Sequence, residues 1–232
     1  MHSAKFGDQT QAAEVLLRYP LALKVFERLN LPLSLGDKTI ERVATEAGVT
    51  PALLLNLLYV SLFHSQDELF RLEASDLPAI VSYLEQSHHY YSLEATPEIL
   101  RIIRTIGEAT TSRTHALVEN FFQQYSLEVD RHFSYENEVA FPYIRRLLRG
   151  SHAAINGYSI REYKQQHNDI EDKLSDLQNL LIRYLSLEEP YRLRRQLFIA
   201  IHLLGEDLSA HTCIENRILI PLVEKEEAKW KK

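Results

Sequence analysis

Two segments of the chain carry a histidine and a glutamate four residues apart, with a proline six residues after each glutamate. The first segment holds His132 and Glu136, and the second holds His211 and Glu215. Residues four apart lie on one face of a helix, so each pair can present an imidazole and a carboxylate to one point. Mixed imidazole and carboxylate ligands suit Fe, Mn and Zn ions. The spacing therefore predicts two metal ligands from each segment.

These segments belong to an internal repeat, in which the residue numbers of matched positions differ by 79. The same offset relates His88 to His167, and each of these precedes the next repeated histidine by an offset of 44. The chain thus encodes two helical hairpins, each with one histidine and one His-x-x-x-Glu pair. The predicted ligands are His88, His132, Glu136, His167, His211 and Glu215.

All six side chains are predicted to face the interior of a helical bundle. At about 100° per residue, His132 shares its face with Tyr125 and Val139. His211 shares its face with Leu222. Burying carboxylates and imidazoles without partners costs several kcal/mol per charged group, and two metal ions supply those partners. A single inward histidine is more often an ordinary hydrogen-bonded core residue, but six convergent groups favour a dinuclear metal site.

The first histidine position has two candidates, His88 and His89. The repeat offset selects His88, which also shares its face with apolar Leu84. His89 stays open as an alternative, because Pro97 removes a backbone hydrogen bond and is expected to kink the helix. The other histidines are interpreted as surface or packing residues: His2, His64, His115, His152 and His202.

Three further acidic residues lie one helical turn from predicted ligands. Glu128 and Asp207 each precede a ligand histidine by four residues, and they are related by the same repeat offset. Metal-bound histidines usually donate their second ring N–H to a carboxylate or another acceptor, so both are candidates for that role. Glu171 follows His167 without a counterpart in the repeat, and a further ligand and an ion-pair partner both stay open for it.

The elements that must position these side chains are helices. The 232 residues include only 7 Gly and 8 Pro, too few turn residues for typical all-β or α/β folds. Apolar residues recur at three- and four-residue steps in four segments, approximately 77–110, 112–148, 159–187 and 189–223. We expect an all-α fold, an antiparallel up-down four-helix bundle over residues 75–224 after a small helical domain over residues 1–70. Residues 225–232 are expected to form a charged, frayed tail.

The N-terminal region has the layout of two short helices, with Gly48 ending one and Thr50-Pro51 beginning the next. A DNA-binding helix-turn-helix is an alternative, but Pro51 to Leu58 carries no Lys or Arg for bases or phosphates. The net charge of −6 also argues against a nucleic-acid partner.

Other features exclude several further classes of protein. The apolar run Leu53–Phe63 is too short to span a bilayer, and the lone Cys213 excludes an internal disulfide. The N-terminus lacks an apolar leader, so a cytoplasmic location without a membrane partner is expected. The sequence has no glycine-rich phosphate loop and no Ser/His/Asp nucleophile arrangement, so no catalytic residue is assigned.

The histidines, the two His-x-x-x-Glu pairs and Phe141-Pro142 together resemble the hemerythrin-like (HHE) family over about residues 77–223. The resemblance is closest to the di-iron proteins called repair of iron centres, whose fourth helix carries His-x-x-x-Glu. It implies two non-haem iron ions with the four histidines as terminal ligands. Glu136 and Glu215 would bridge both ions in an oxo- and carboxylate-bridged pair, and Zn or Mn are alternative metals. Oxygen-carrying hemerythrins have a second histidine where this chain has Glu171.

The N-terminal region resembles the small N-terminal domain of the same family, through Tyr19-Pro20, Val25-Phe26 and Leu35 to Ile40. Ser34-Leu35 replaces the family's Cys-Cys pair, which puts a thiol-dependent role of that domain in doubt. The resemblance implies binding of O₂, NO or peroxide in a nitrosative or oxidative stress response, with iron-centre repair as a further role. A reversible oxygen-binding protein stays open, as does a gas- or redox-sensing regulator with a protein partner on the N-terminal domain. A carboxylate-rich di-iron oxidase is disfavoured, since such sites use Glu-x-x-His.

Overall fold

The protein is helical throughout the part of the chain that the computed structural model describes. This part comprises residues 6–64, 70–108, 113–150, 158–166, 174, 176–179 and 191–230. Within these ranges the β-type pairing is limited to an isolated bridge between Gln11 and Thr39. The prediction of an all-α fold is confirmed.

Short helices form the N-terminal region. They are α1 (Ala12–Arg18), the 3₁₀ turn η1 (Pro20–Ala22), α2 (Leu23–Arg28), α3 (Ile40–Glu46) and α4 (Pro51–Phe63). The Thr50 hydroxyl accepts the backbone N–H of Leu53, and Pro51 occupies the first helical position, as expected at the start of α4. The same hydroxyl donates to the Asp76 carboxylate at 2.6 Å. The N-cap of α4 is thereby tied to the segment that begins the bundle.

Three long helical runs come next along the chain, and each contains one π-helical turn. The first comprises η2 (Ala74–Asp76, 3₁₀), α5 (Leu77–Tyr90), η3 (Tyr91–Ala95, π) and α6 (Thr96–Glu108). The second comprises α7 (Arg113–Tyr135), η4 (Glu136–Ala140, π) and α8 (Phe141–Leu148). The last comprises α11 (Tyr191–Ile214), η6 (Glu215–Leu219, π) and α12 (Ile220–Trp230). The described part of the remaining predicted helix contains α9 (Ile160–Gln166).

Each π-helical turn ends two residues before a proline, at Pro97, Pro142 and Pro221. A proline in a helix lacks the N–H for its backbone hydrogen bond, and its ring crowds the carbonyl four residues earlier. The i→i+5 bonding of a π turn gives that carbonyl room. The response to Pro97 is therefore a π turn within a helix that continues to Glu108.

The π turns also change which residues face inward beyond them. Val139 is 36% exposed, whereas its neighbour Ala140 is 1% exposed. Leu222 is only partly buried, whereas Val223 is completely buried. A π turn adds about one residue to a helical turn, so a uniform 100° step misplaces the residues beyond it. The predictions that Val139 and Leu222 face the interior are wrong for this reason.

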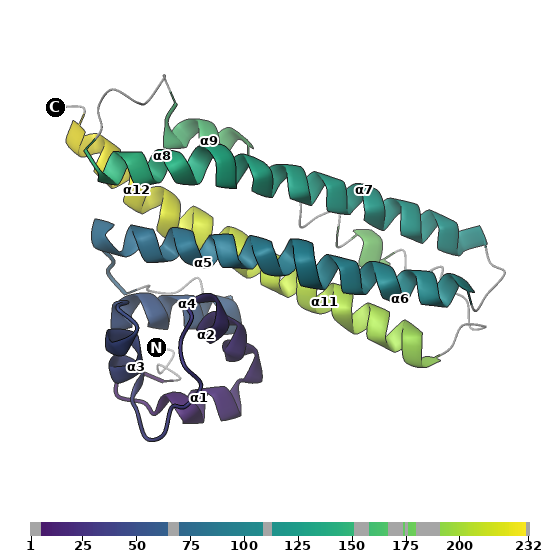
Figure 1. The fold of residues 1–232 in the computed structure, drawn as a ribbon, viewed down its shortest axis with the longest axis horizontal. Coiled ribbons are helices and arrows are strands. Elements are labelled where there is room, and N and C mark those ends of the chain that lie inside the picture. Colours follow the sequence, from purple (N-terminus) through teal and green to yellow (C-terminus); the bar gives the residue numbers. More distant parts are fainter. Residues whose placement is uncertain are drawn as a thin grey trace. The chain divides into compact units, whose positions relative to one another are not determined.

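The chain divides into two compact units. Unit 1 contains Met1–Gln86, Tyr143–Ile160 and Ala210–Lys232, and unit 2 contains Ser87–Pro142 and Arg161–Ser209. In unit 1, α2 and α3 pack against α4 (Figure 1). The buried leucines of α4 are Leu53, Leu54, Leu55, Leu57 and Leu58. This packing accounts for the apolar composition of α4.

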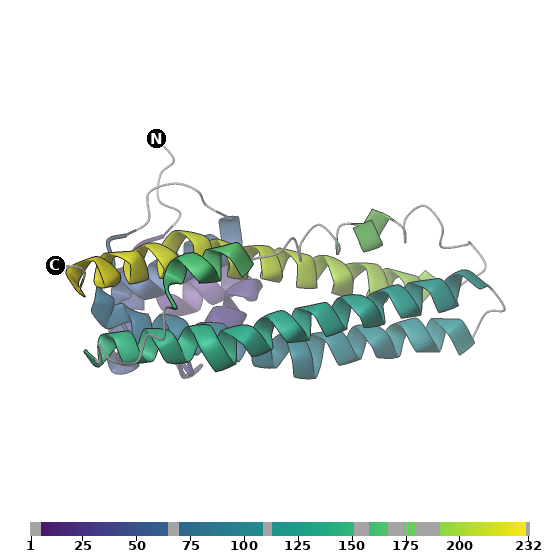
Figure 2. The same ribbon diagram turned by 90° about the horizontal axis from the view of Figure 1, so that it is seen from above.

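The core of unit 2 lies where α6 runs alongside α7 (Figures 1 and 2). The N-terminal part of α11, Tyr191–Ser209, contributes a further face, and Tyr91, Leu174 and Leu177 also belong to this core. Its buried members include Ile99, Ile103, Phe122, Val129, Phe133, Leu197, Ile201 and Leu204. This apolar core fixes the rotation of α6, α7 and α11, and therefore the direction in which their polar inward residues point.

Among the residues that the structure describes, one helix, Tyr191–Lys229, is long and apolar enough by length and composition to span a membrane. The pair α3 and α4 passes the same test only if taken together, and the two helices are bent by 115° at their break. Leu197, Ile201 and Leu204 of the long helix are buried in the core of unit 2. Its apolar composition is accounted for by that packing.

The C-terminal residues differ from the expected frayed tail. Residues 225–230 continue α12, and the Glu227 side chain lies on its buried face at 7% exposure. Glu227 Oε1 accepts the Tyr143 hydroxyl at 2.5 Å and the backbone N–H of Ile160 at 2.7 Å. The prediction of a frayed tail is wrong for residues 225–230, because one carboxylate of this charged run is a buried hydrogen-bond acceptor.

A surface ion pair also holds α12. Lys225 donates to Glu73 at 3.3 Å, and this contact, with a smaller effect from Arg71, lowers the pKa of Glu73. We expect Lys225→Met to raise the pKa of Glu73 toward its ordinary value, measured by NMR titration of the side-chain carboxyl. Because the folded-state pKa is the depressed one, the pair's small stabilisation is present above the unfolded-state pKa. It is lost as the pH falls through the folded-state pKa.

Glu46 is an internal control for that titration. Its pKa is lowered by separate contacts with Lys38 and Arg42, which the Lys225 substitution leaves in place. An unchanged pKa of Glu73 in the variant would contradict the assignment of Lys225 as the main cause.

Candidate metal centre

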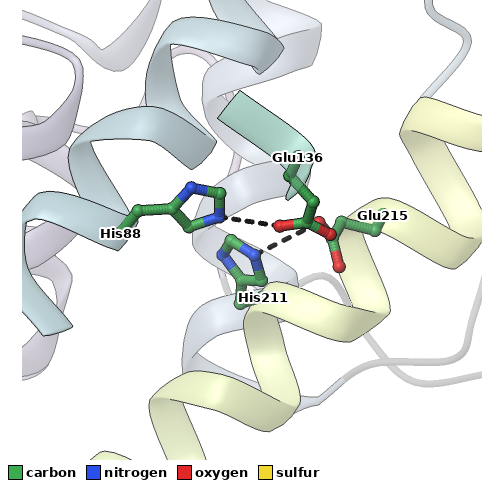
Figure 3. A group of neighbouring side chains, drawn as sticks. All are labelled: His88, Glu136, His211 and Glu215. Carbon is green, nitrogen blue, oxygen red and sulfur yellow. Dashed lines mark ion pairs between the residues drawn. The ribbon is translucent and has the colours of Figure 1, made fainter. Parts of the chain in front are cut away.

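Four of the six predicted ligands converge in the structure. His88, Glu136, His211 and Glu215 are all buried, and each offers a ligand atom within 4.8 Å of those of the others (Figure 3). Both carboxylates are completely buried. Two carboxylates buried beside imidazoles need a positively charged partner, and a cation is suited to that role.

Glu136 presents its two oxygens to different imidazoles. His88 Nε2 lies 3.0 Å from Oε2, and His132 Nε2 lies 3.0 Å from Oε1. In the second His-x-x-x-Glu segment, His211 Nε2 lies 3.2 Å from Oε1 of Glu215. One carboxylate placed between two imidazoles in this way can bind a cation on each side.

These separations fit ligands of a common ion. Two ligand atoms that bind one ion at about 2.1 Å, and at right angles to each other, lie about 3.0 Å apart. The three imidazole–carboxylate distances of 3.0, 3.0 and 3.2 Å match that value. The donor set of nitrogen and carboxylate oxygen atoms suits iron, manganese or zinc.

Each ligand glutamate is the first residue of a π turn. Glu136 begins η4 and Glu215 begins η6, directly after the helical turn that carries His132 or His211. The preceding regular helix keeps each histidine one turn from its glutamate, and the π turn then carries the backbone past the proline. Local π turns of this kind are frequent at functional sites.

His88 is held by aromatic packing and by one polar contact. Its ring stacks on Phe133 at a centroid distance of 4.1 Å and on Phe141 at 5.5 Å. Nδ1 lies 2.9 Å from Oδ1 of Asn137, an amide oxygen that can only accept, so Nδ1 carries the proton. A neutral imidazole with this proton has its lone pair on Nε2, the atom that faces Glu136. His89 is exposed, so the structure places His88 and not His89 in the cluster.

Tyr163 of α9 also contacts the cluster. Its side chain is 1% exposed, and its hydroxyl donates to Glu136 Oε1 at 2.9 Å. The Oε1 atom therefore accepts a hydrogen bond from a neutral donor in addition to its approach to His132.

The remaining predicted site residues have different positions. His132 contacts Glu136, as described, with a side chain that is 12% exposed. His167 and Glu171 lie outside the described residues. Asp207 is buried one turn before His211, whereas Glu128 is exposed. The proposed hydrogen-bonding roles of Glu128 and Asp207 stay predictions.

Sequence reasoning did not identify Asn137 or Tyr163. The signal for Asn137 is present in the repeat, because Glu136-Asn137 recurs in the second hairpin as Glu215-Asn216. Tyr163 lies one turn before His167 on the face that also buries Ile160. A buried tyrosine normally has a hydrogen-bond partner, and that rule applied to this face would have indicated a polar neighbour.

Most of the region that contains these residues resembles a known protein family. A family model described as the hemerythrin HHE cation-binding domain matches residues 80–227, which include the whole cluster and all three π turns. A search of curated proteins finds no match.

Proposed function

Because the chain belongs to the hemerythrin HHE cation-binding family, we propose that it is a non-haem di-iron protein that binds O₂, NO or reactive oxygen species. The single observation that carries this proposal is the approach of two imidazoles to different oxygens of Glu136. A carboxylate with ligand partners on both sides is suited to hold two cations close together, as two-metal sites require.

The proposed ligands divide between the two ions. His88 and Glu136 Oε2 would bind one ion, and His132 and Glu136 Oε1 would bind the other. His211 and Glu215 supply a further imidazole and a second carboxylate to the pair. The repeat assigns His167 as the fourth histidine.

This set of protein side chains suits the binding of small, redox-active molecules at the metal ions. Two iron ions with about six protein ligands have open positions and can change oxidation state, so a diatomic molecule or peroxide can bind there. Phe133, Phe141 and Tyr91 are buried and form an apolar stack with His88. This lining leaves the site suited to a small ligand and excludes bulk water from His88.

The cellular setting belongs to the proposal as well. We place the protein in the cytoplasm, in the response to nitrosative or oxidative stress, where iron from the site would contribute to the repair of damaged iron centres. The N-terminal helices of residues 1–70, which precede the family match, are the proposed contact for a protein partner.

The direct test is metal analysis and spectroscopy of protein purified without added metal. We expect about two iron ions per chain and Mössbauer parameters of a coupled pair, with optical spectra that change on exposure to O₂, NO or peroxide. A metal-free protein of normal stability, or one that binds a single ion, would contradict the di-iron assignment. If the metal analysis finds Zn or Mn in place of iron, the metal site is retained but the proposed binding of O₂, NO or peroxide is contradicted.

The same spectra separate the remaining functions. A stable adduct with O₂ that is released on lowering the oxygen pressure would indicate reversible oxygen binding. Loss of a bound partner on deletion of residues 1–70, with the metal retained, would indicate a regulator. Transfer of iron to a damaged iron centre, dependent on His132 and His211, would support repair.

A further inference from the structure

We propose that the two cation positions at Glu136 are each set by a different positioning residue. Tyr163 acts on the position formed by His132 and Oε1, and Asn137 acts on the position formed by His88 and Oε2. This inference rests on the proposed two-ion site and adds to it an internal asymmetry. The two ions are then held with different affinities.

Tyr163 acts through the carboxylate. Its hydroxyl lies 2.9 Å from Oε1, and its buried ring has little freedom to move. The hydrogen bond fixes the rotation of the Glu136 carboxylate and withdraws negative charge from Oε1. Outer hydrogen bonds of this kind orient ligating carboxylates and tune the metal that they bind.

Asn137 acts through the imidazole. Its amide oxygen accepts the Nδ1 proton of His88 at 2.9 Å, which leaves the Nε2 lone pair directed at the Oε2 side of Glu136. The contact also helps to hold the ring nearly parallel to those of Phe133 and Phe141, whose planes are inclined to it by 15° and 11°. An asparagine supports this tautomer without adding a charge, unlike the carboxylates that serve many ligand histidines.

The two residues come from different helical elements and make different contacts. Asn137 follows Glu136 in the π turn η4, and its side chain reaches back to α5. Tyr163 approaches from α9. Tyr163 contacts the Oε1 atom, which faces one cation position, and Asn137 contacts His88, which faces the other. Loss of either contact is therefore expected to affect mainly that position.

Cobalt(II) titration of the metal-free full-length chain, followed by optical absorption and calorimetry, tests this inference. We expect the wild type to bind two ions. Tyr163→Phe and Asn137→Ala should each weaken one of them by about 10–100-fold and leave the other unchanged. Asn137→Asp, which keeps an acceptor for Nδ1, should retain wild-type affinity or exceed it.

Tyr143→Phe is the matched control. Tyr143 is also a buried tyrosine that donates to a buried carboxylate, but its partner Glu227 belongs to no proposed cation position. We expect both cobalt ions to bind this variant with wild-type affinity. Weakened cobalt binding there would mean that loss of any buried hydroxyl in the bundle lowers affinity, and it would overturn the proposal.

A His132→Ala background assigns the positions. Removing His132 weakens the Oε1 position, so adding Tyr163→Phe should change the remaining ion little, whereas adding Asn137→Ala should weaken it. The inference is overturned if Tyr163→Phe weakens the remaining ion, or if Asn137→Ala does not. The Asn137→Ala comparison still tests the inference if the Tyr163→Phe variant does not fold. If the wild type binds only one cobalt ion, the proposed function itself is contradicted. If the wild type binds two ions but the variants weaken both of them equally, only this inference is contradicted.

Discussion

Replacing Glu136 with alanine is expected to remove both of the proposed iron ions from the protein. Its two oxygens each lie 3.0 Å from a different imidazole, so one side chain serves both cation positions. His132→Ala removes a ligand from one position only. We therefore expect iron content to fall from about two ions per chain to near zero in Glu136→Ala, and to about one in His132→Ala. Metal analysis of the purified variants measures this difference.

Glu138 provides the control for that comparison. It lies two residues after Glu136 in the same π turn, but its side chain is exposed. Glu138→Ala should retain the full iron content. Retention of about one ion by Glu136→Ala would show that the carboxylate serves a single position, and the bridging assignment would then be wrong.

Glu227→Ala is expected to destabilise the fold by about 2–4 kcal/mol, because buried donors that lose an acceptor have no water to replace it. The substitution removes the shared acceptor of the Tyr143 hydroxyl and the Ile160 backbone N–H. The second of these is the first N–H of α9, the helix that carries Tyr163. Urea unfolding of the metal-free protein measures the effect without a contribution from bound metal.

Two substitutions make this prediction specific. Glu227→Gln keeps a side-chain oxygen that can accept both donors, so most of the stability should return. Glu224→Ala removes an exposed carboxylate from the same helix and should change the stability by less than about 0.5 kcal/mol. If Glu227→Ala and Glu224→Ala unfold at the same urea concentration, the buried contacts of Glu227 do not stabilise the fold.

Much of the candidate site could be predicted because its determinants are local. A histidine and a glutamate four residues apart share a helical face wherever that helix packs, and the internal repeat identifies which such pairs belong together. The choice of His88 over His89 rests on the same repeat, and the structure places His88 in the cluster. The start of α4 at Thr50-Pro51 is equally local, since an N-cap and a first-turn proline act within one turn.

Errors begin where the helix departs from regular geometry. A constant angle per residue holds through His132 and Glu136, but the π turn at Glu136–Ala140 alters the register of the residues beyond it. The regular step therefore predicts Val139 inside, whereas its side chain is exposed. The prolines that accompany these turns are visible in the sequence, but whether a helix kinks or widens at a proline depends on the packing on either side.

By itself, the sequence determined the helical class, the internal repeat and five candidate ligand residues that lie in contact in the structure, because helical periodicity is a property of the local backbone. Only the tertiary structure decided which outer groups hold them: Asn137 on His88, Tyr163 on Glu136, and Glu227 at the start of α9. These contacts join side chains to partners on other helices, far away along the chain. A hydrogen bond requires its atoms within about 3 Å, and no sequence spacing specifies that once the partners lie on different helices.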